Sequence, residues 1–279
     1  ENLEPAFLKT AVGVAKGQIA YNYYAPQLYD PRMGIIQAIA AEGRNKGKPL
    51  ATLVNYATHP EILGTKRKKI SPDLCGPLYQ RIEKKGGGVA LFFNSAQGGM
   101  VTADNRGENG KEANTWQECI RIGHLMADEA LRIIQSAPVQ KDPSLFCASK
   151  NIAIPVESMA MKTALQNSPL IQNSKAGRNL DSISARINLI NIGQAQAVTI
   201  PGEALPNIGY YIKRNMKTEQ PFLFGLTNDA FGYIMTKEDF NSFERYDYIT
   251  RTSLGEMTWE ILEKEMMEMI EAAPKAEQY

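Results

Sequence analysis

Two histidines are the only side chains in this sequence of 279 residues whose ordinary pKa lies near neutrality. His59 ends an apolar run and is followed by Pro60, which places it where a strand meets a loop, a position typical of ligand sites in open α/β sheets. On its own, a lone histidine is more often a hydrogen-bonded structural residue than a ligand. His124 lies inside a long amphipathic segment with no metal-ligand spacing around it, and we interpret it as structural.

Two further segments place polar groups directly after an apolar run. Glu203 follows Pro201 and Gly202 at the predicted start of a helix, where an acid also complements the positive end of the helix dipole. Tyr233 closes the segment NDAFGY, which likewise ends a predicted strand and is rich in polar groups. Taken alone, Tyr233 would be a packing residue.

The three cysteines, Cys75, Cys119 and Cys147, are widely spaced and form no CxxC pair. Their odd number and spacing suggest neither a disulfide framework nor a thiolate zinc site. We interpret them as buried or inert thiols.

Composition indicates a folded globular protein, with 43% hydrophobic and 22% charged residues. The net charge of +1 argues against nucleic acid or an anionic membrane as a partner. No apolar run reaches the roughly 18 residues of a transmembrane helix, and the start ENLEPAFLKT does not resemble a signal peptide. We expect one domain over residues 1–279.

Short apolar runs alternate with helical patterns along the chain. Residues 33–43 and 50–59 are predicted strands, separated by a Gly-, Asn- and Pro-containing turn. Ser71, Pro72 and Asp73 form a typical helix start, and we expect that helix to end near Lys84. A strand at 88–94, a long polar loop at 95–112 and an amphipathic helix at 112–136 follow.

The second half repeats this alternation of strands and helices. We predict strands at 150–156, 185–193 and 196–202, the last two as a hairpin, then a helix at 203–215, a strand at 221–228 and a helix at 257–272. The polar segment 166–182 is predicted to be mobile. The fold class that follows is α/β, a layered mixed β-sheet domain flanked by helices.

Five blocks in order resemble neutral, non-lysosomal ceramidases and their shorter bacterial relatives. The blocks are VNYATHPEIL, KKISPDLCGPLYQRIE, ALFFNSAQGGMVTAD, VTIPGEALPNIGYYI and LTNDAFGYIMTKEDFNSFERYDYITRTSLG. No single block is specific, but five in order are hard to obtain by chance. The resemblance covers nearly the whole chain and implies a ceramidase-like catalytic domain.

Carried over position by position, the resemblance implies a catalytic zinc ion held by His59, Glu203 and Tyr233. Such an ion lowers the pKa of a bound water and polarises an amide carbonyl. Tyr246 matches a second tyrosine that hydrogen-bonds the developing oxyanion. That match needs one extra residue between Tyr233 and Tyr246, and Tyr248 is the alternative.

Two features depart from the family pattern. A further zinc-binding histidine, from a Thr-His-Thr-His-Ser-Gly-Pro-Gly-Gly type of motif, has no counterpart here, and we expect that an N-terminal segment of the family domain is missing. Val101 falls where the family's active-site serine is expected, with Thr102 adjacent. Valine offers neither a nucleophile nor a donor. A one-residue shift makes Thr102 the candidate substitute hydroxyl, but a threonine in such a loop more often only stabilises the loop. No block of this sequence resembles the C-terminal immunoglobulin-like domain of long ceramidases, and we expect only the catalytic domain over residues 1–279.

The resulting hypothesis is a zinc-dependent hydrolase of linear amide bonds, acting on N-acylsphingosine or a related small-molecule or lipid amide. One alternative is a catalytically degraded, ligand-binding relative, suggested by the missing histidine motif and by Val101. Another is a hydrolase of a different bond on the same metal platform, because fold analogy does not choose a substrate. The resemblance also implies a secreted or periplasmic protein.

Overall fold

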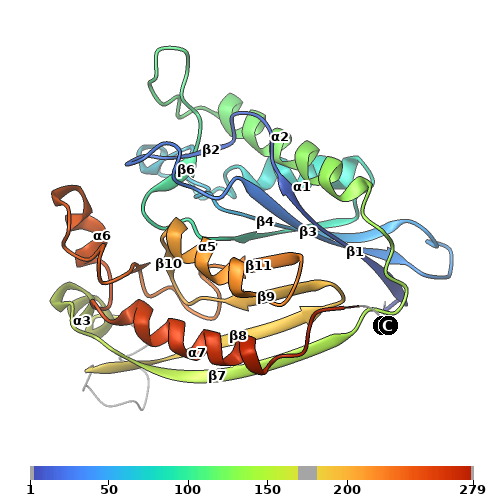
Figure 1. Cartoon of the computed structure of the whole chain (residues 1–279). Helices are drawn as coiled ribbons and strands as arrows, with labels where there is room; N and C mark the ends of the chain where they lie inside the picture. Colours follow the sequence, from blue (N-terminus) through green and yellow to red (C-terminus); the bar gives the residue numbers. More distant parts are fainter. Residues whose placement is uncertain (1–2, 169–180, 278–279) are drawn as a thin grey trace.

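The computed structural model describes residues 3–168 and 181–277, which form two four-stranded sheets flanked by helices (Figure 1). The strands of the first sheet, in spatial order, are β1 (Ala6–Val14), β3 (Arg32–Ala40), β4 (Pro49–Tyr56) and β5 (Val89–Asn94). Those of the second sheet are β11 (Gln220–Phe224), β9 (Ala195–Thr199), β8 (Ser182–Ile192) and β7 (Leu145–Pro155). Both sheets are mixed, because β4–β5 and β9–β11 are parallel whereas the other neighbours are antiparallel.

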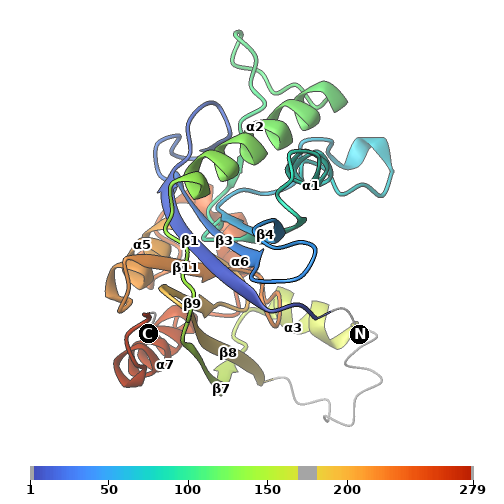
Figure 2. The ribbon, with the colours of Figure 1, turned by 90° about the vertical axis from the view of Figure 1, so that its right-hand side faces the viewer.

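The helices lie on the outer faces of the two sheets. α1 (Cys75–Lys84) and α2 (Trp116–Gln135) cover the first sheet, and α5 (Pro206–Asn215) and α7 (Thr258–Ala272) pack against the second (Figures 1 and 2). The shorter helical segments are η1 (Thr65–Arg67), α3 (Met159–Gln166), η2 (Glu244–Tyr246) and α6 (Asp247–Arg251). The layered α/β fold predicted from the sequence is confirmed.

Alternation along the strands supplies the apolar layers of this sandwich. In β3, Ile35 faces α1 and α2, whereas the next residue, Ile36, faces the second sheet. The layer between the sheets also contains Phe222 and Phe224 of β11. A Cβ atom on Gly34 would lie only 2.5 Å from the Phe222 ring, so the close approach of the two sheets requires glycine at that position.

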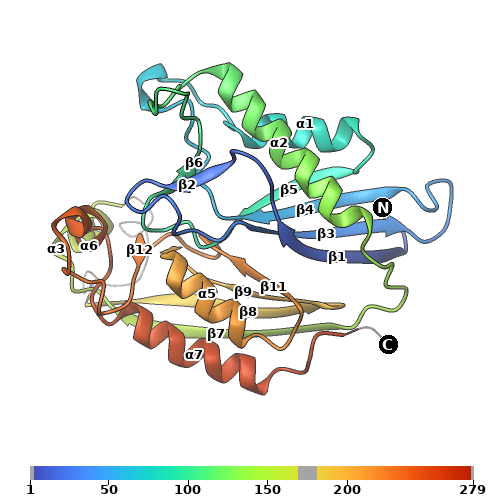
Figure 3. The same cartoon turned by 45° about the horizontal axis from the view of Figure 1, so that its top comes forward.

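Two very short sheets lie at one end of the sandwich. β2 (Ala20–Asn22) pairs antiparallel with β6 (Val101–Ala103), and β10 (Glu203–Ala204) pairs in parallel with β12 (Tyr233–Ile234). Figure 3 shows β2, β6 and β12 at the same end as α6. β6 lies inside the segment predicted as loop, so that prediction is wrong for residues 101–103.

The predicted helix start at Ser71 is also wrong. α1 begins at Cys75, because Asp73 has a left-handed backbone with φ of 50°, which a helix cannot continue through. The Asp73 carboxylate instead accepts hydrogen bonds from the backbone N–H groups of Ile62 and Leu63 at 3.1 and 2.8 Å. It therefore ties the loop that follows His59 to the start of α1.

Other boundaries differ by a few residues. The helix predicted from Glu203 begins at Pro206, because Glu203 and Ala204 pair with β12, and the strand predicted to end at 228 ends at Phe224. The long helix begins at Trp116, where the Thr115 side chain caps it. The predicted mobile segment 166–182 falls mostly outside the described residues. No helix in the described ranges is long and apolar enough to span a membrane.

A buried ion pair between Lys213 and Asp30 joins α5, which packs on the second sheet, to the segment before β3. The Lys213 Nζ atom lies 3.0 Å from an Asp30 carboxylate oxygen, and the two side chains are 4% and 2% exposed. Arg32 donates two further hydrogen bonds to the Asp30 carboxylate, at 2.8 and 2.9 Å. Burial alone would raise the pKa of Asp30, but the charges of Lys213 and Arg32 hold it below its usual range.

The Asp30→Ala substitution is expected to lower the free energy of unfolding by about 3–5 kcal/mol, because it leaves the buried Lys213 ammonium without a partner. The matched control is Asp128→Ala, which breaks the half-exposed pairs with Arg81 and Lys85 and should cost about 1 kcal/mol or less. Urea denaturation followed by circular dichroism measures both. An equal decrease in the free energy of unfolding in the two variants would show that burial of the Asp30–Lys213 pair does not increase its contribution to stability.

Candidate functional site

His59 is held beside the Gly-rich loop by backbone pairing. It lies three residues after β4, where it forms an isolated parallel bridge with Thr102 of β6, and its N–H donates to the Val101 carbonyl at 3.2 Å. Its Nδ1 atom lies 2.6 Å from the same carbonyl. Because a carbonyl oxygen only accepts hydrogen bonds, Nδ1 must carry a proton, and Nε2 is the atom turned toward the site.

Glu203 reaches the same point from the second sheet. It follows β9 by four residues, and in the β10–β12 ladder it lies opposite Tyr233. The Gly-rich loop is fastened to this ladder, because the Gly98 N–H donates to the Ala204 carbonyl at 2.8 Å. A Cβ atom on Gly98 would lie 2.2 Å from the Glu203 carbonyl oxygen, so only glycine allows this approach.

The structure brings two of the predicted metal ligands into direct contact. His59 Nε2 lies 2.8 Å from Glu203 Oε2, and the two side chains are 17% and 19% exposed. With Nδ1 already protonated, this contact is a hydrogen bond only when a proton lies between Nε2 and Oε2. Burial lowers the pKa of His59, but the hydrogen bond and charge of Glu203 outweigh it and raise the pKa above its usual value.

Tyr233, the third predicted ligand, lies beside this pair. Its hydroxyl lies 3.8 Å from the Met100 sulfur, and the residue is 8% exposed. Burial and the negative charge of Glu203 raise the pKa of Tyr233. In the metal-free protein Tyr233 is therefore a neutral phenol.

The two candidates for the second tyrosine occupy different places around Tyr233. The Tyr248 ring contacts the Tyr233 ring edge-on, with centroids 5.9 Å apart. Tyr246 packs near Tyr233 in a small apolar cluster, but its ring contacts are with Tyr24 and Phe243, at 5.7 and 5.3 Å. The oxyanion role of Tyr246 stays a prediction, with Tyr248 as its alternative.

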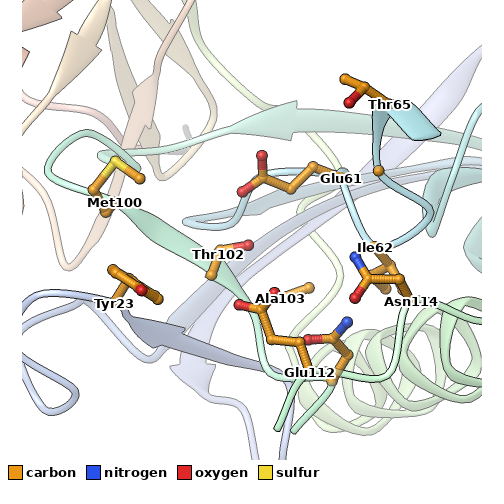
Figure 4. A pocket seen from close by; sticks show the side chains of 11 residues that line it. Tyr23, Glu61, Ile62, Thr65, Met100, Thr102, Ala103, Glu112 and Asn114 are labelled. Carbon is orange, nitrogen blue, oxygen red and sulfur yellow. The ribbon is translucent and has the colours of Figure 1, made fainter. Parts of the chain in front are cut away.

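Val101 and Thr102 have opposite environments. Val101 is completely buried, and its carbonyl holds His59. Thr102 is half-buried and lines a pocket of about 350 Å³, into which Figure 4 shows its side chain projecting. Thr102 is bridged to His59 through the backbone, and the catalytic role of its hydroxyl stays a prediction.

The donor set is chemically suited to a zinc ion. Two basic atoms, Nε2 of His59 and a carboxylate oxygen of Glu203, face each other. Because both are electron-pair donors, a proton or a metal ion has to lie between them. In a tetrahedral site, ligand atoms about 2.0–2.1 Å from zinc lie roughly 3.3 Å apart, so a shift of about half an ångström would admit the ion. Within the described ranges no group of three His, Cys, Asp or Glu side chains is placed to hold a metal, so Tyr233 would have to complete the set.

Sequence reasoning missed two neighbours of the site. Met100 contacts Tyr233 and has a left-handed backbone with φ of 71°, and Glu61 is close enough for its charge to raise the pKa of both His59 and Tyr233. The position of Glu61 two residues after His59 was the available signal. The remaining expectations agree with the structure: His124 lies on α2, and all three cysteines are free, with Cys147 exposed.

In metal-free protein, the Glu203→Gln substitution is expected to lower the pKa of His59, because it removes the charge and the charged hydrogen bond that oppose burial most strongly and leaves only the smaller effects of the Val101 carbonyl and Glu61 against it. His124 is the internal control, since burial and the charge of Arg81 already lower its pKa and the substitution is remote from it. An NMR titration resolves the two imidazoles. An unchanged His59 pKa would show that the carboxylate does not act on it.

The Gly98→Ala substitution is expected to cost about 1–3 kcal/mol of stability, because the new methyl group collides with backbone atoms of β10. Gly107→Ala is the control, since its methyl group would meet nothing closer than 3.5 Å. Thermal unfolding of the two variants measures the difference. Equal melting temperatures would mean that the loop and β10 are not in tight contact.

Comparison with known proteins adds the fold relationship. No protein-family model matches the chain, and no curated protein matches its sequence. Neutral ceramidase from Pseudomonas aeruginosa has a similar structure, with a TM-score of 0.74 and 17% identity over 99% of this chain and 54% of that chain. A ceramidase structure in complex with C2 gives a TM-score of 0.73 at 15% identity, over 99% of this chain and 55% of that chain. The chain therefore spans about half the length of these proteins, and over that length it has the fold of neutral ceramidase.

Proposed function

We propose that this protein is a zinc-dependent hydrolase of linear amide bonds, acting on N-acylated amines such as ceramide. The observation that carries the proposal is the 2.8 Å contact between His59 Nε2 and Glu203 Oε2, with Nδ1 occupied by the Val101 carbonyl. Two basic ligand atoms aimed at one point, in a fold like that of neutral ceramidase, support a metal site at this place.

His59, Glu203 and Tyr233 would hold the zinc ion. When bound, such an ion supplies Lewis-acid polarisation of the amide carbonyl and makes a water molecule acidic near neutral pH. Compared with the ceramidase pattern, one histidine ligand has no counterpart in this sequence.

The remaining residues would orient the substrate. Hydrolysis joins the oxygen of water to the carbonyl carbon and breaks the C–N bond, and the departing amine takes a proton. Tyr246, or Tyr248 as its alternative, would donate a hydrogen bond to the carbonyl oxygen as negative charge develops on it. Thr102 would place its hydroxyl beside the reacting carbon. The resemblance to exported ceramidases further supports a secreted or periplasmic protein.

The test combines zinc binding and turnover in the whole chain. Isothermal titration with zinc, at a pH where His59 is neutral, is expected to give one site per chain, and a fluorogenic N-acyl amine should be hydrolysed with loss of activity on chelation. His59→Ala and Glu203→Gln should each weaken zinc binding by at least about 100-fold, since even outer partners of metal ligands cost 10- to 100-fold.

His124→Ala is the matched control, because it removes the other histidine from the surface of α2. It should bind zinc and hydrolyse the amide as the unaltered protein does. Zinc binding that survives loss of either His59 or Glu203 would refute the proposed site. Zinc binding without turnover of any N-acyl amine would instead favour a ligand-binding relative.

A further inference from the structure

The pocket beside Thr102 is lined mainly by polar groups. Its volume is about 350 Å³, and carboxylates are contributed by Glu61, just after His59, and by Glu112, just before α2 (Figure 4). In this view the two acids lie on opposite sides of Thr102. No lysine, arginine or histidine lines the pocket, so its two negative charges have no balancing charge within its walls.

Two arginines near the pocket have other partners. Arg106 makes two hydrogen bonds to Asp104, at 2.7 and 2.8 Å, and stacks on the Tyr21 ring. Arg67 donates to the Asn114 carbonyl at 2.7 Å. Glu112 accepts one hydrogen bond, from the Tyr21 hydroxyl at 2.9 Å, and the charge of Arg106 acts on it from nearby, but no side chain in the described part of the chain forms an ion pair with it.

An unpartnered amide lines the same pocket. Asn105 is 4% exposed, and its side chain makes no hydrogen bond to any residue in the described part of the chain. Buried polar side chains are normally hydrogen-bonded, and an exception calls for a partner that is not part of the protein. Because the amide lines the pocket, it is available to hydrogen-bond water or a polar ligand there.

The pocket opens directly beside the candidate site. Thr102 is bridged to His59 through the backbone, and Met100, another lining residue, lies against the Tyr233 hydroxyl. A molecule whose amide lies between His59 and Thr102 would extend one of its two halves into the pocket. The side chains that line the pocket therefore help to determine which amide substrates bind.

A hydrocarbon chain is a poor occupant of these walls. It would strip water from Glu61 and Glu112 without offering a counter-charge, which is costly for ionised carboxylates. An ammonium group would instead pair with the acids and donate to the Asn105 carbonyl oxygen. The exposed Tyr23 ring, also part of the wall, adds a surface that attracts cations.

We infer that this pocket binds a positively charged amine half of the substrate, so that the preferred substrates are N-acyl amines carrying a second, free ammonium group. The inference rests on the proposed function for the position of the scissile amide. The pocket itself is defined without reference to zinc, so its charge preference can be measured separately.

The experiment compares three probes with the same acetyl group and chain length: monoacetylated diaminobutane, N-butylacetamide and N-acetyl-aminobutanoate. Isothermal titration on metal-free protein is expected to show the cationic probe binding about tenfold more tightly than the neutral one, with the anionic probe weakest. Raising the salt from about 50 to 500 mM should reduce this preference, because the acids are partly screened.

Glu61→Gln and Glu112→Gln should each weaken binding of the cationic probe about three- to fivefold and leave the neutral probe unchanged. Glu108→Gln, an exposed acid outside the pocket, is the matched control and should have no effect. Equal binding of the cationic and neutral probes would overturn the inference. So would stoichiometric binding of calcium that abolishes probe binding, since it would make the pocket a metal site.

Turnover distinguishes this inference from the proposed function. Charge-selective binding without hydrolysis of any probe would leave the pocket assignment standing and refute the hydrolase. Hydrolysis of neutral N-acyl amines as fast as cationic ones would leave the hydrolase standing and refute the charge preference.

Discussion

The face-to-face packing of the two sheets is the constraint on which the site depends. His59 follows a strand of the first sheet and Glu203 follows a strand of the second, so the distance between them is set by the apolar layer in between. That layer is thin where the Phe222 ring lies against Gly34. A bulkier residue at this contact would separate the sheets and with them His59 Nε2 and Glu203 Oε2.

Around this constraint, the site is built from elements too small to be stable alone. β6, β10 and β12 are two or three residues long, so the few hydrogen bonds to their partner strands are supplemented by hydrogen bonds to neighbouring loops. The Gly98 N–H bonded to Ala204 connects the loop that carries Thr102 to the ladder that carries Glu203 and Tyr233. The buried Asp30–Lys213 pair holds the same two halves together from another side.

The larger elements are predictable from the sequence because their apolar periodicity extends over many residues. The pattern of α2 and the alternation in β8 identify these elements directly. The order of motifs predicts His59, Glu203 and Tyr233 as a set. The short strands carry no periodicity, since two residues cannot alternate. The start of α1 was predicted wrongly for a different reason. In the sequence Asp73 looks like an ordinary acid in the first turn of a helix, whereas in the structure its backbone is left-handed and its carboxylate bonds the loop after His59.

The separation of His59 and Glu203 along the chain has a consequence for biosynthesis. The two residues are 144 positions apart, and Tyr233 lies further still toward the C-terminus. A nascent chain emerging from the ribosome exposes the histidine long before its acidic partner exists. The contact between the imidazole and the carboxylate therefore cannot form during early synthesis, and it has to follow the docking of the second sheet onto the first.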